Sequence, residues 1–112
     1  MGLVASQSAF YFDSCRFGLW LESKGYTVTG GELYRPPVLQ KIYFESGASK
    51  TMDGQHPKRL AIDLNLFIGG VLLGFEGYRE AGAYWKSMHP LNRWGGDIKG
   101  LLDGNHFERL ES

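Results

Sequence analysis

Two short groups of polar residues in this sequence have side chains that can bind a metal ion or transfer a proton. The first group is His56 and Asp63, seven positions apart, with Asp63 inside a run that otherwise alternates apolar residues. On one continuous strand, an odd separation would point the two side chains to opposite faces. They converge only if the chain bends after His56, and Pro57 favours such a bend.

The second group is Asp103 and His106 in the sequence DGNH. Gly104 and Asn105 between them permit a tight turn that can bring both side chains to one side. A hydrolytic zinc site usually takes about three protein ligands from His, Asp and Glu, and it uses a separate carboxylate to move the proton. The two His and two Asp residues can together supply one metal cleft of this kind.

The same residues also have an ordinary structural interpretation. Aspartate is common on the exposed face of a strand, a His-Pro pair is usually a loop feature, and the pattern DxxH occurs by chance in many proteins. The spacing alone therefore leaves two interpretations open, a metal site and a set of solvated polar side chains.

Hydrophobic spacing and the positions of Gly and Pro predict the elements that must hold these side chains. The pattern predicts helices over 6–24, 35–47 and 76–90, a strand or hairpin over 26–34, a loop over 47–58, a β-hairpin over 59–75 that turns at Gly69 and Gly70, and a short strand over 105–110. Within that hairpin, the apolar residues at even positions from 60 to 68 share one face, which leaves Asp63 on the other. This mixture favours an α+β fold, a small antiparallel sheet with helices packed on it.

The composition of the 112 residues excludes several classes of protein. The length suits one modest core, so we expect a single domain over 1–112. Twelve basic and twelve acidic residues cancel, which gives no strong field for nucleic acid or an anionic membrane. The lone Cys15 excludes an internal disulfide framework, and no apolar run reaches the roughly 20 residues of a membrane span. The N-terminus lacks the order of a secretory signal, so we expect synthesis in the cytoplasm without an export signal.

Two stretches of the chain resemble a known family of peptidoglycan enzymes. HPKRLAIDL followed by DGNHFE is similar to the zinc D-alanyl-D-alanine carboxypeptidases, dipeptidases and L-alanyl-D-glutamate endopeptidases, which include many phage endolysins. The family motifs are Ser-x-His-x-x-Gly-x-Ala-x-Asp and Glu/Asp-x-x-His followed by an aromatic residue. The matching residues are His56, Ala61 and Asp63 in the first motif, and Asp103, His106 and Phe107 in the second. Paired motifs in the correct order are more specific than either alone.

The resemblance extends over about residues 25 to 110 and implies a fold and a metal. The implied fold is the one shared by hedgehog signalling domains and D-Ala-D-Ala peptidases, with one Zn²⁺ ion. The resemblance implies that His56, Asp63 and His106 bind this zinc ion. It also implies that Asp103 is the catalytic base and acid.

Four more residues can be interpreted as part of such a site. Arg35 and Gln40 lie in YRPPVLQ, and the family places an Arg here, whose guanidinium can hold a carboxylate or a developing oxyanion. A surface cation beside a proline turn is the alternative for Arg35. Trp94, just before GGD, is a candidate for substrate binding as a cleft wall, or it is a packing element. Glu108 either contacts His106 from the same side of a strand or is solvated.

The chain departs from the first family motif at two positions. Gly54 stands where the family has Ser, and Arg59 stands where it has Gly. In the family, the Ser helps to orient the substrate or a ligand, so Gly54 affects substrate binding and rate. No implied metal ligand is missing.

The resemblance implies that the chain hydrolyses a peptidoglycan stem peptide with water that zinc activates. The bond between L-Ala and D-Glu is the first candidate, because the compact chain and its WGGD sequence most resemble the endopeptidase branch. Release of terminal D-Ala is the second candidate. We expect a monomer of phage or prophage origin that reaches the cell wall through lysis or virion partners. A noncatalytic zinc-containing module for wall binding or a virion is the alternative, but the Asp103 carboxylate favours an enzyme.

Overall fold

The computed structural model describes residues 2–31, 36–47, 55–99 and 101–111. Its helices and strands are α1 (Leu3–Ser23), β1 (Thr27–Gly30), α2 (Pro37–Glu45), β2 (Ala61–Ile68), β3 (Val71–Leu72), the 3₁₀ helix η1 (Phe75–Tyr78), α3 (Arg79–Met88), β4 (Asn92–Trp94), the 3₁₀ helix η2 (Gly95–Asp97) and β5 (His106–Arg109). The fold is α+β with a small antiparallel sheet, as the sequence predicts.

The longest strand, β2, has partners along both of its edges. β1 pairs with its second half, with Gly30 opposite Leu64, and β5 pairs with its first half, with Asp63 opposite His106. β4 pairs with the other edge of β5, β3 folds back on the end of β2, and the resulting order is β1-β2-β5-β4. In this order β5, the strand nearest the C-terminus, lies between two strands that precede it in the sequence.

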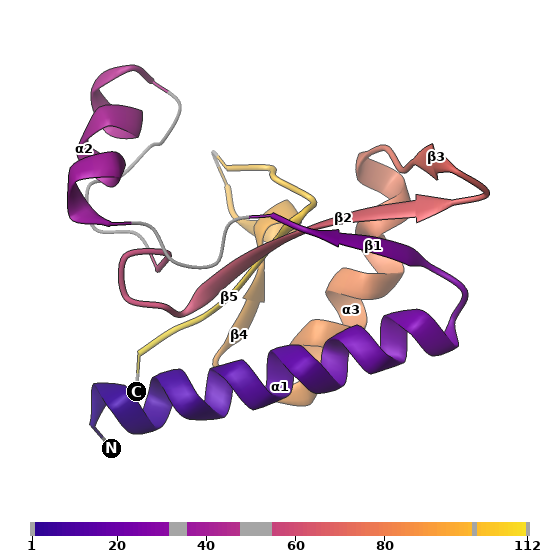
Figure 1. Cartoon of the computed structure of the whole chain (residues 1–112), viewed down its shortest axis with the longest axis horizontal. Coiled ribbons are helices and arrows are strands. Elements are labelled where there is room, and N and C mark those ends of the chain that lie inside the picture. The colour runs from indigo at the N-terminus through magenta and orange to yellow at the C-terminus, as the bar shows by residue number, and fades with distance from the viewer. Residues whose placement is uncertain (1, 32–35, 48–54, 100, 112) are drawn as a thin grey trace.

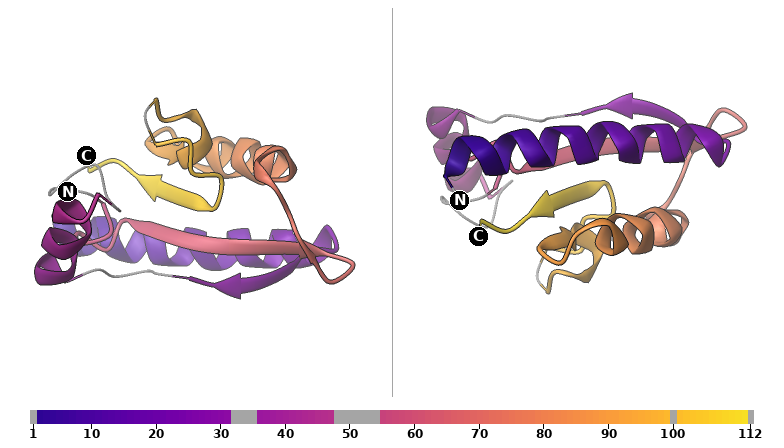
Figure 2. Two further views of the ribbon diagram at one scale, coloured as in Figure 1. Left: turned by 90° about the horizontal axis from the view of Figure 1, so that it is seen from above. Right: turned by 90° about the horizontal axis from the view of Figure 1, so that it is seen from below.

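An aromatic core joins the sheet to α1 and α3. The ring of Phe17 in α1 lies 5.2 Å from that of Trp85 in α3 and 5.0 Å from that of Phe107 in β5, measured between centroids. All three residues have no exposed surface. Figure 1 shows α1 running beneath β1 and β2, with α2 on the opposite side of β2, and Figure 2 shows the same arrangement from above and below.

The predicted helices are confirmed with shifted ends. The helix predicted over 6–24 is α1, and the helix predicted over 35–47 is α2, which begins at Pro37 and ends at Glu45. The third predicted helix begins later than expected, because residues 75–78 form η1 before α3 starts. Within the described residues, no helix is both long and apolar enough to span a membrane.

The predicted strands are confirmed in their main features. The hairpin of β2 and β3 turns at Gly69 and Gly70, which have φ angles of +58° and +80°. The strand predicted over 26–34 is β1, and positions 32–34 of that prediction lie outside the described residues. The sequence pattern does not predict β4, whose three residues follow closely after Pro90.

A turn directly before β2 supplies the bend that the sequence predicts after His56. The amide of Arg59 donates to the carbonyl of His56 at 3.0 Å. The side chain of Gln7 in α1 donates to a carbonyl of this turn at 2.9 Å, and the side chain of Gln55 donates to the carbonyl of Arg109 at 2.6 Å. The turn is therefore fixed to both α1 and β5.

Arg59 adopts a left-handed backbone conformation, with a φ of +59°. A side chain in this conformation crowds the backbone and costs about 1–2 kcal/mol, whereas glycine adopts it freely. The family motif has glycine at this position, and the φ angle gives a physical reason for it.

We predict that Arg59→Gly relieves this strain and that Arg59→Ala does not. Both changes remove the side chain, so the difference between the two variants isolates the backbone effect. Glycine loses more backbone entropy on folding than alanine does, and this loss offsets part of the relieved strain. We therefore expect Arg59→Gly to be more stable than Arg59→Ala by about 1 kcal/mol. Urea unfolding of the two variants measures this difference. Equal stabilities would show that the turn does not impose the left-handed conformation.

Candidate metal centre

His56 and Asp63, which are close in the sequence, meet His106, which is distant from both. His56 lies in the turn before β2, Asp63 lies in β2, and His106 begins β5. One ligand atom from each residue lies within 4.8 Å of the other two. Asp63 Oδ1 is 3.2 Å from His56 Nε2 and 3.2 Å from His106 Nδ1. The group can hold a metal ion.

The register of β2 and β5 places two of these side chains together. Asp63 is directly opposite His106, and residues opposite each other on antiparallel strands have Cβ atoms about 4.5–5.5 Å apart. Their neighbours Ile62 and Phe107 are also paired and point to the other face, because side chains alternate along a strand. Phe107 lies in the aromatic core, so the candidate metal ligands Asp63 and His106 lie on the face away from the core.

The hydrogen bonds of His106 distinguish its two ring nitrogens. Nε2 is 2.7 Å from Glu108 Oε1, and Nδ1 faces Asp63. Glu108 Oε2 accepts hydrogen bonds from Nε and Nη2 of Arg93 at 3.0 and 2.6 Å. A histidine that binds a metal almost always donates its other N–H to a carboxylate, a backbone carbonyl or water. Of the two interpretations of Glu108, the contact with His106 is confirmed, and its side chain is only 6% exposed.

The three donor groups fit a zinc ion by their chemistry. Two imidazole nitrogens and one carboxylate oxygen form a donor set that catalytic zinc sites use, with a further position left for water. His56 and His106 are buried, and Asp63 is partly buried. Burial on this scale is unusual for solvated polar residues, so these side chains are not simply solvated, and the group could hold a metal ion.

The charges of the group favour an ionised Asp63. Burial alone would raise the pKa of Asp63, but its hydrogen bonds to His106 and His56 outweigh this effect and lower the pKa to about 2. Burial alone would lower the pKa of His106, but Asp63 and Glu108 outweigh it and raise the pKa to about 9. A metal ion that binds Nδ1 of His106 must displace a proton, because imidazole binds metals in its neutral form.

Asp103 lies beside the three candidate metal ligands, His56, Asp63 and His106. The amide of His106 donates to the carbonyl of Asp103 at 3.2 Å, which closes the predicted turn. Burial and the negative charge of Asp63 raise the pKa of the Asp103 carboxyl, against the opposing effects of His106 and the amide of Asn105. A carboxyl with a raised pKa is suited to accept a proton and to return it.

The WGGD sequence supports the turn that carries Asp103. A Cβ atom at Gly95 would lie 2.3 Å from the carbonyl oxygen of Asp103 and 2.8 Å from Cβ of His106, so only glycine fits. The indole N–H of Trp94 donates to the carbonyl of Gly104 at 2.7 Å. Trp94 is 2% exposed, which supports the packing interpretation, and its predicted contact with substrate stays a prediction.

The remaining predicted residues have mixed outcomes. Gln40 is fully buried in α2, and its role in substrate binding stays a prediction. Arg35 and Gly54 lie outside the described residues. The sequence pattern does not predict a role for Arg93, and its only signal is an Arg two positions before a Gly-Gly and next to a Trp. The role of Arg93 follows only from the pairing of β4 with β5, which places Arg93 opposite Glu108.

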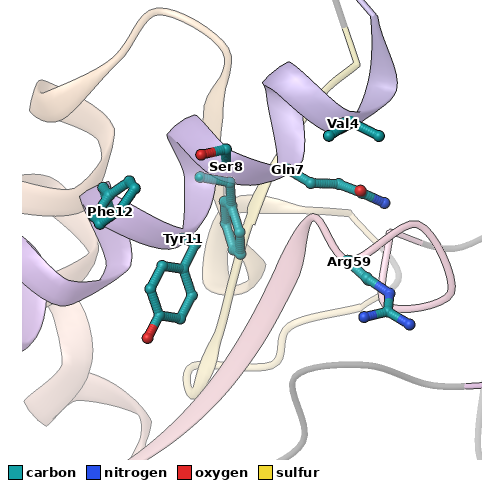
Figure 3. Close-up of a pocket in the computed structure, with 7 residues that line it drawn as sticks. Val4, Gln7, Ser8, Tyr11, Phe12 and Arg59 are labelled. Carbon is teal, nitrogen blue, oxygen red and sulfur yellow. The ribbon is translucent and has the colours of Figure 1, made fainter.

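A hollow lies elsewhere, along the first half of α1. Its volume is about 530 Å³, and Val4, Gln7, Tyr11 and Phe12 line it, with Arg59 on its other side (Figure 3). Its described lining residues include no His, Asp, Glu or Cys. Its described lining therefore offers no general acid or base of these types.

We predict that Glu108→Gln weakens metal binding by about 10- to 100-fold, since the neutral amide no longer orients and polarises His106 as a carboxylate does. Glu76→Gln is the matched control, because Glu76 also pairs with an arginine, Arg79, but at the exposed surface. A competition titration against a chelating dye measures both affinities. Unchanged affinity in Glu108→Gln would remove Glu108 from the metal centre.

Comparisons with known proteins bear on the fold of the chain. No protein family model matches the chain, and no curated protein matches it. The structure is similar to the crystal structure of the Serratia marcescens L-Ala D-Glu endopeptidase ChiX, with a TM-score of 0.64 and 24% sequence identity. The match covers 74% of this chain but only 66% of the ChiX chain. The chain shares the fold of an L-Ala D-Glu endopeptidase.

Proposed function

We propose that the chain is a zinc-dependent peptidoglycan peptidase that cuts a stem peptide between L-Ala and D-Glu. The observation that carries the proposal is the meeting of His56, Asp63 and His106 on a fold shared with an L-Ala D-Glu endopeptidase. The resemblance of both motifs to peptidoglycan peptidases supports the substrate class. In this proposal residues 1–112 act as one zinc peptidase domain.

The proposed metal ligands are Nε2 of His56, Oδ1 of Asp63 and Nδ1 of His106. Bound zinc would supply a Lewis acid and lower the pKa of a coordinated water to about 7. The ionised Asp63 supplies the negative charge that attracts the cation. Glu108 holds the His106 ring in place through Nε2, which leaves Nδ1 directed toward the centre.

Asp103 performs the proton transfers in this proposal. Its carboxylate accepts a proton from the attacking water and then donates it to the leaving amine of the cut peptide bond. Burial and the neighbouring Asp63 raise its pKa, so its protonated form is more accessible than that of an exposed aspartate. We further propose that Arg35 holds the substrate or the oxyanion, a role that rests on the family resemblance.

The proposed site of action is the bacterial cell wall. The substrate is the peptidoglycan stem peptide, and we propose delivery by phage lysis or virion partners to a monomeric enzyme, as in phage endolysins. The products identify the bond, because cutting between L-Ala and D-Glu and releasing terminal D-Ala give fragments of different mass.

We predict one zinc ion per chain in protein purified without chelator, since the three donor groups form one site. Elemental analysis measures the content. Chelation should abolish the cleavage of defined muropeptides, and added zinc should restore it, with mass spectrometry identifying the fragments. Full activity in a metal-free chain would contradict the zinc mechanism.

We predict that Asp63→Ala and Asp103→Ala lose activity for different reasons. Asp63→Ala should bind zinc much more weakly and melt at a lower temperature in the presence of zinc, because metal binding contributes to folding free energy. Asp103→Ala should keep zinc and near-normal melting, while hydrolysis falls by roughly 100- to 10,000-fold, the usual contribution of general acid-base catalysis.

Asp97→Ala is the control for both variants. Asp97 is an exposed aspartate that pairs with Lys86, and its loss should leave zinc content and cleavage unchanged. If Asp103→Ala loses zinc while Asp63→Ala keeps both zinc and activity, the proposed assignment of ligand and base is wrong.

A further inference from the structure

A second hollow lies directly beside Asp103. Its volume is about 260 Å³, and its described lining includes Asn65, Leu72, Phe75, Leu102, Asp103 and Asn105. Asn65 follows Asp63 by two positions in β2, so the two side chains point to the same face, about 7 Å apart along the strand. The hollow therefore lies on the same face of β2 as the candidate metal ligand Asp63.

Two carboxamides line the hollow and contact each other. Nδ2 of Asn105 donates to Oδ1 of Asn65 at 3.1 Å. Each carboxamide has one NH₂ group and one carbonyl oxygen, so this bond occupies the NH₂ of one residue and the oxygen of the other. Reversing both amides gives the same result. The NH₂ group of one residue and the carbonyl oxygen of the other take no part in this bond, and a peptide offers the carbonyl acceptor and the N–H donor that such groups can bind.

The charge of the hollow selects against anions. The described residues that line it include one carboxylate, Asp103, and no Lys, Arg or His. An anionic group of a ligand would be repelled by this carboxylate without a compensating cation. An uncharged peptide group is the ligand whose charge and hydrogen-bonding groups match the lining.

Exposed apolar side chains complete the hollow. Leu72 is 55% exposed and Leu102 is 65% exposed. These leucines contribute apolar surface that a bound peptide would remove from water. The described lining thus combines apolar side chains with a few polar ones, as ligand pockets usually do.

We propose that this hollow holds an uncharged peptide group of the substrate next to the bond that is cut, and that Asn65 and Asn105 determine its specificity. The proposal rests on the proposed peptidase function. The hollow also reaches the proposed base, because Asp103 itself is one of its lining residues. A substrate seated on the two amides would therefore lie beside the group that moves the proton.

Two variants of Asn65 test the donor that faces the substrate. Asn65→Asp keeps the oxygen that accepts from Asn105 and nearly the same shape, but it replaces the NH₂ donor by a charged oxygen. Asn65→Ala removes both groups. We expect each variant to raise KM for a defined stem peptide by about tenfold, as expected for the loss of a hydrogen bond to the ligand. The turnover number should change much less, and zinc content and melting temperature should stay unchanged.

The two residues of β3 provide a matched pair for the apolar wall. Leu72 and Val71 are both more than half exposed, but only Leu72 lines the hollow. We expect Leu72→Ala to raise KM several-fold and Val71→Ala to leave it unchanged.

The outcomes separate the subsite from the proposed function. If the zinc-loaded wild type cuts stem peptides and the Asn65 and Leu72 variants have its KM, the subsite is wrong and the peptidase function stands. If a rise in KM comes with lost zinc or a lower melting temperature, Asn65 has a structural role and the subsite is also wrong. If the zinc-loaded wild type cuts no stem peptide, both the function and the subsite are wrong.

Discussion

The antiparallel pairing of β2 with β5 is the constraint on which both the core and the candidate site depend. One face of this pair places Asp63 opposite His106, and the other face places Ile62 opposite Phe107. A slip of one residue in β2 would exchange its faces, because side chains alternate along a strand. It would send a carboxylate into the aromatic core. The packing of the core therefore also fixes the position of the candidate metal ligands Asp63 and His106.

Charges of alternating sign extend across three strands from this pair. Arg93 in β4 contacts Glu108 in β5, Glu108 contacts His106, and His106 contacts Asp63 in β2. Buried ionic groups are stable only when each has a partner of opposite charge and good geometry. The row thereby explains how several ionisable groups are accommodated on one small sheet. It also explains why the short strand β4 matters to the site. β4 contributes none of the three candidate ligands, but its Arg93 contacts Glu108, which contacts His106.

The sequence predicts what depends on local spacing and leaves open what depends on distant pairing. The bend after His56 and the turn between Asp103 and His106 follow from Pro57, Gly104 and Asn105, which are close in the chain. The contact of Glu108 with His106 was one of two open interpretations, because its choice depends on Arg93 and on the pairing of β4 with β5. Trp94 was ambiguous for the same reason, since its stacking partner Phe75 lies far away in the sequence. The family resemblance indicated which residues meet, whereas the register shows how they do so.

The position of β5 in the sheet has a consequence for protein synthesis. β5 is the last described strand of the sequence, but it lies between β2 and β4, and it carries His106. While a ribosome makes the chain, β2 and β4 have no strand between them until residues 106–109 emerge. The nascent chain therefore cannot assemble the three donor groups early, although other proteins often fold from the N-terminus as they are made. A chain stalled before β5 would lack His106, so it could not form the complete group of His56, Asp63 and His106.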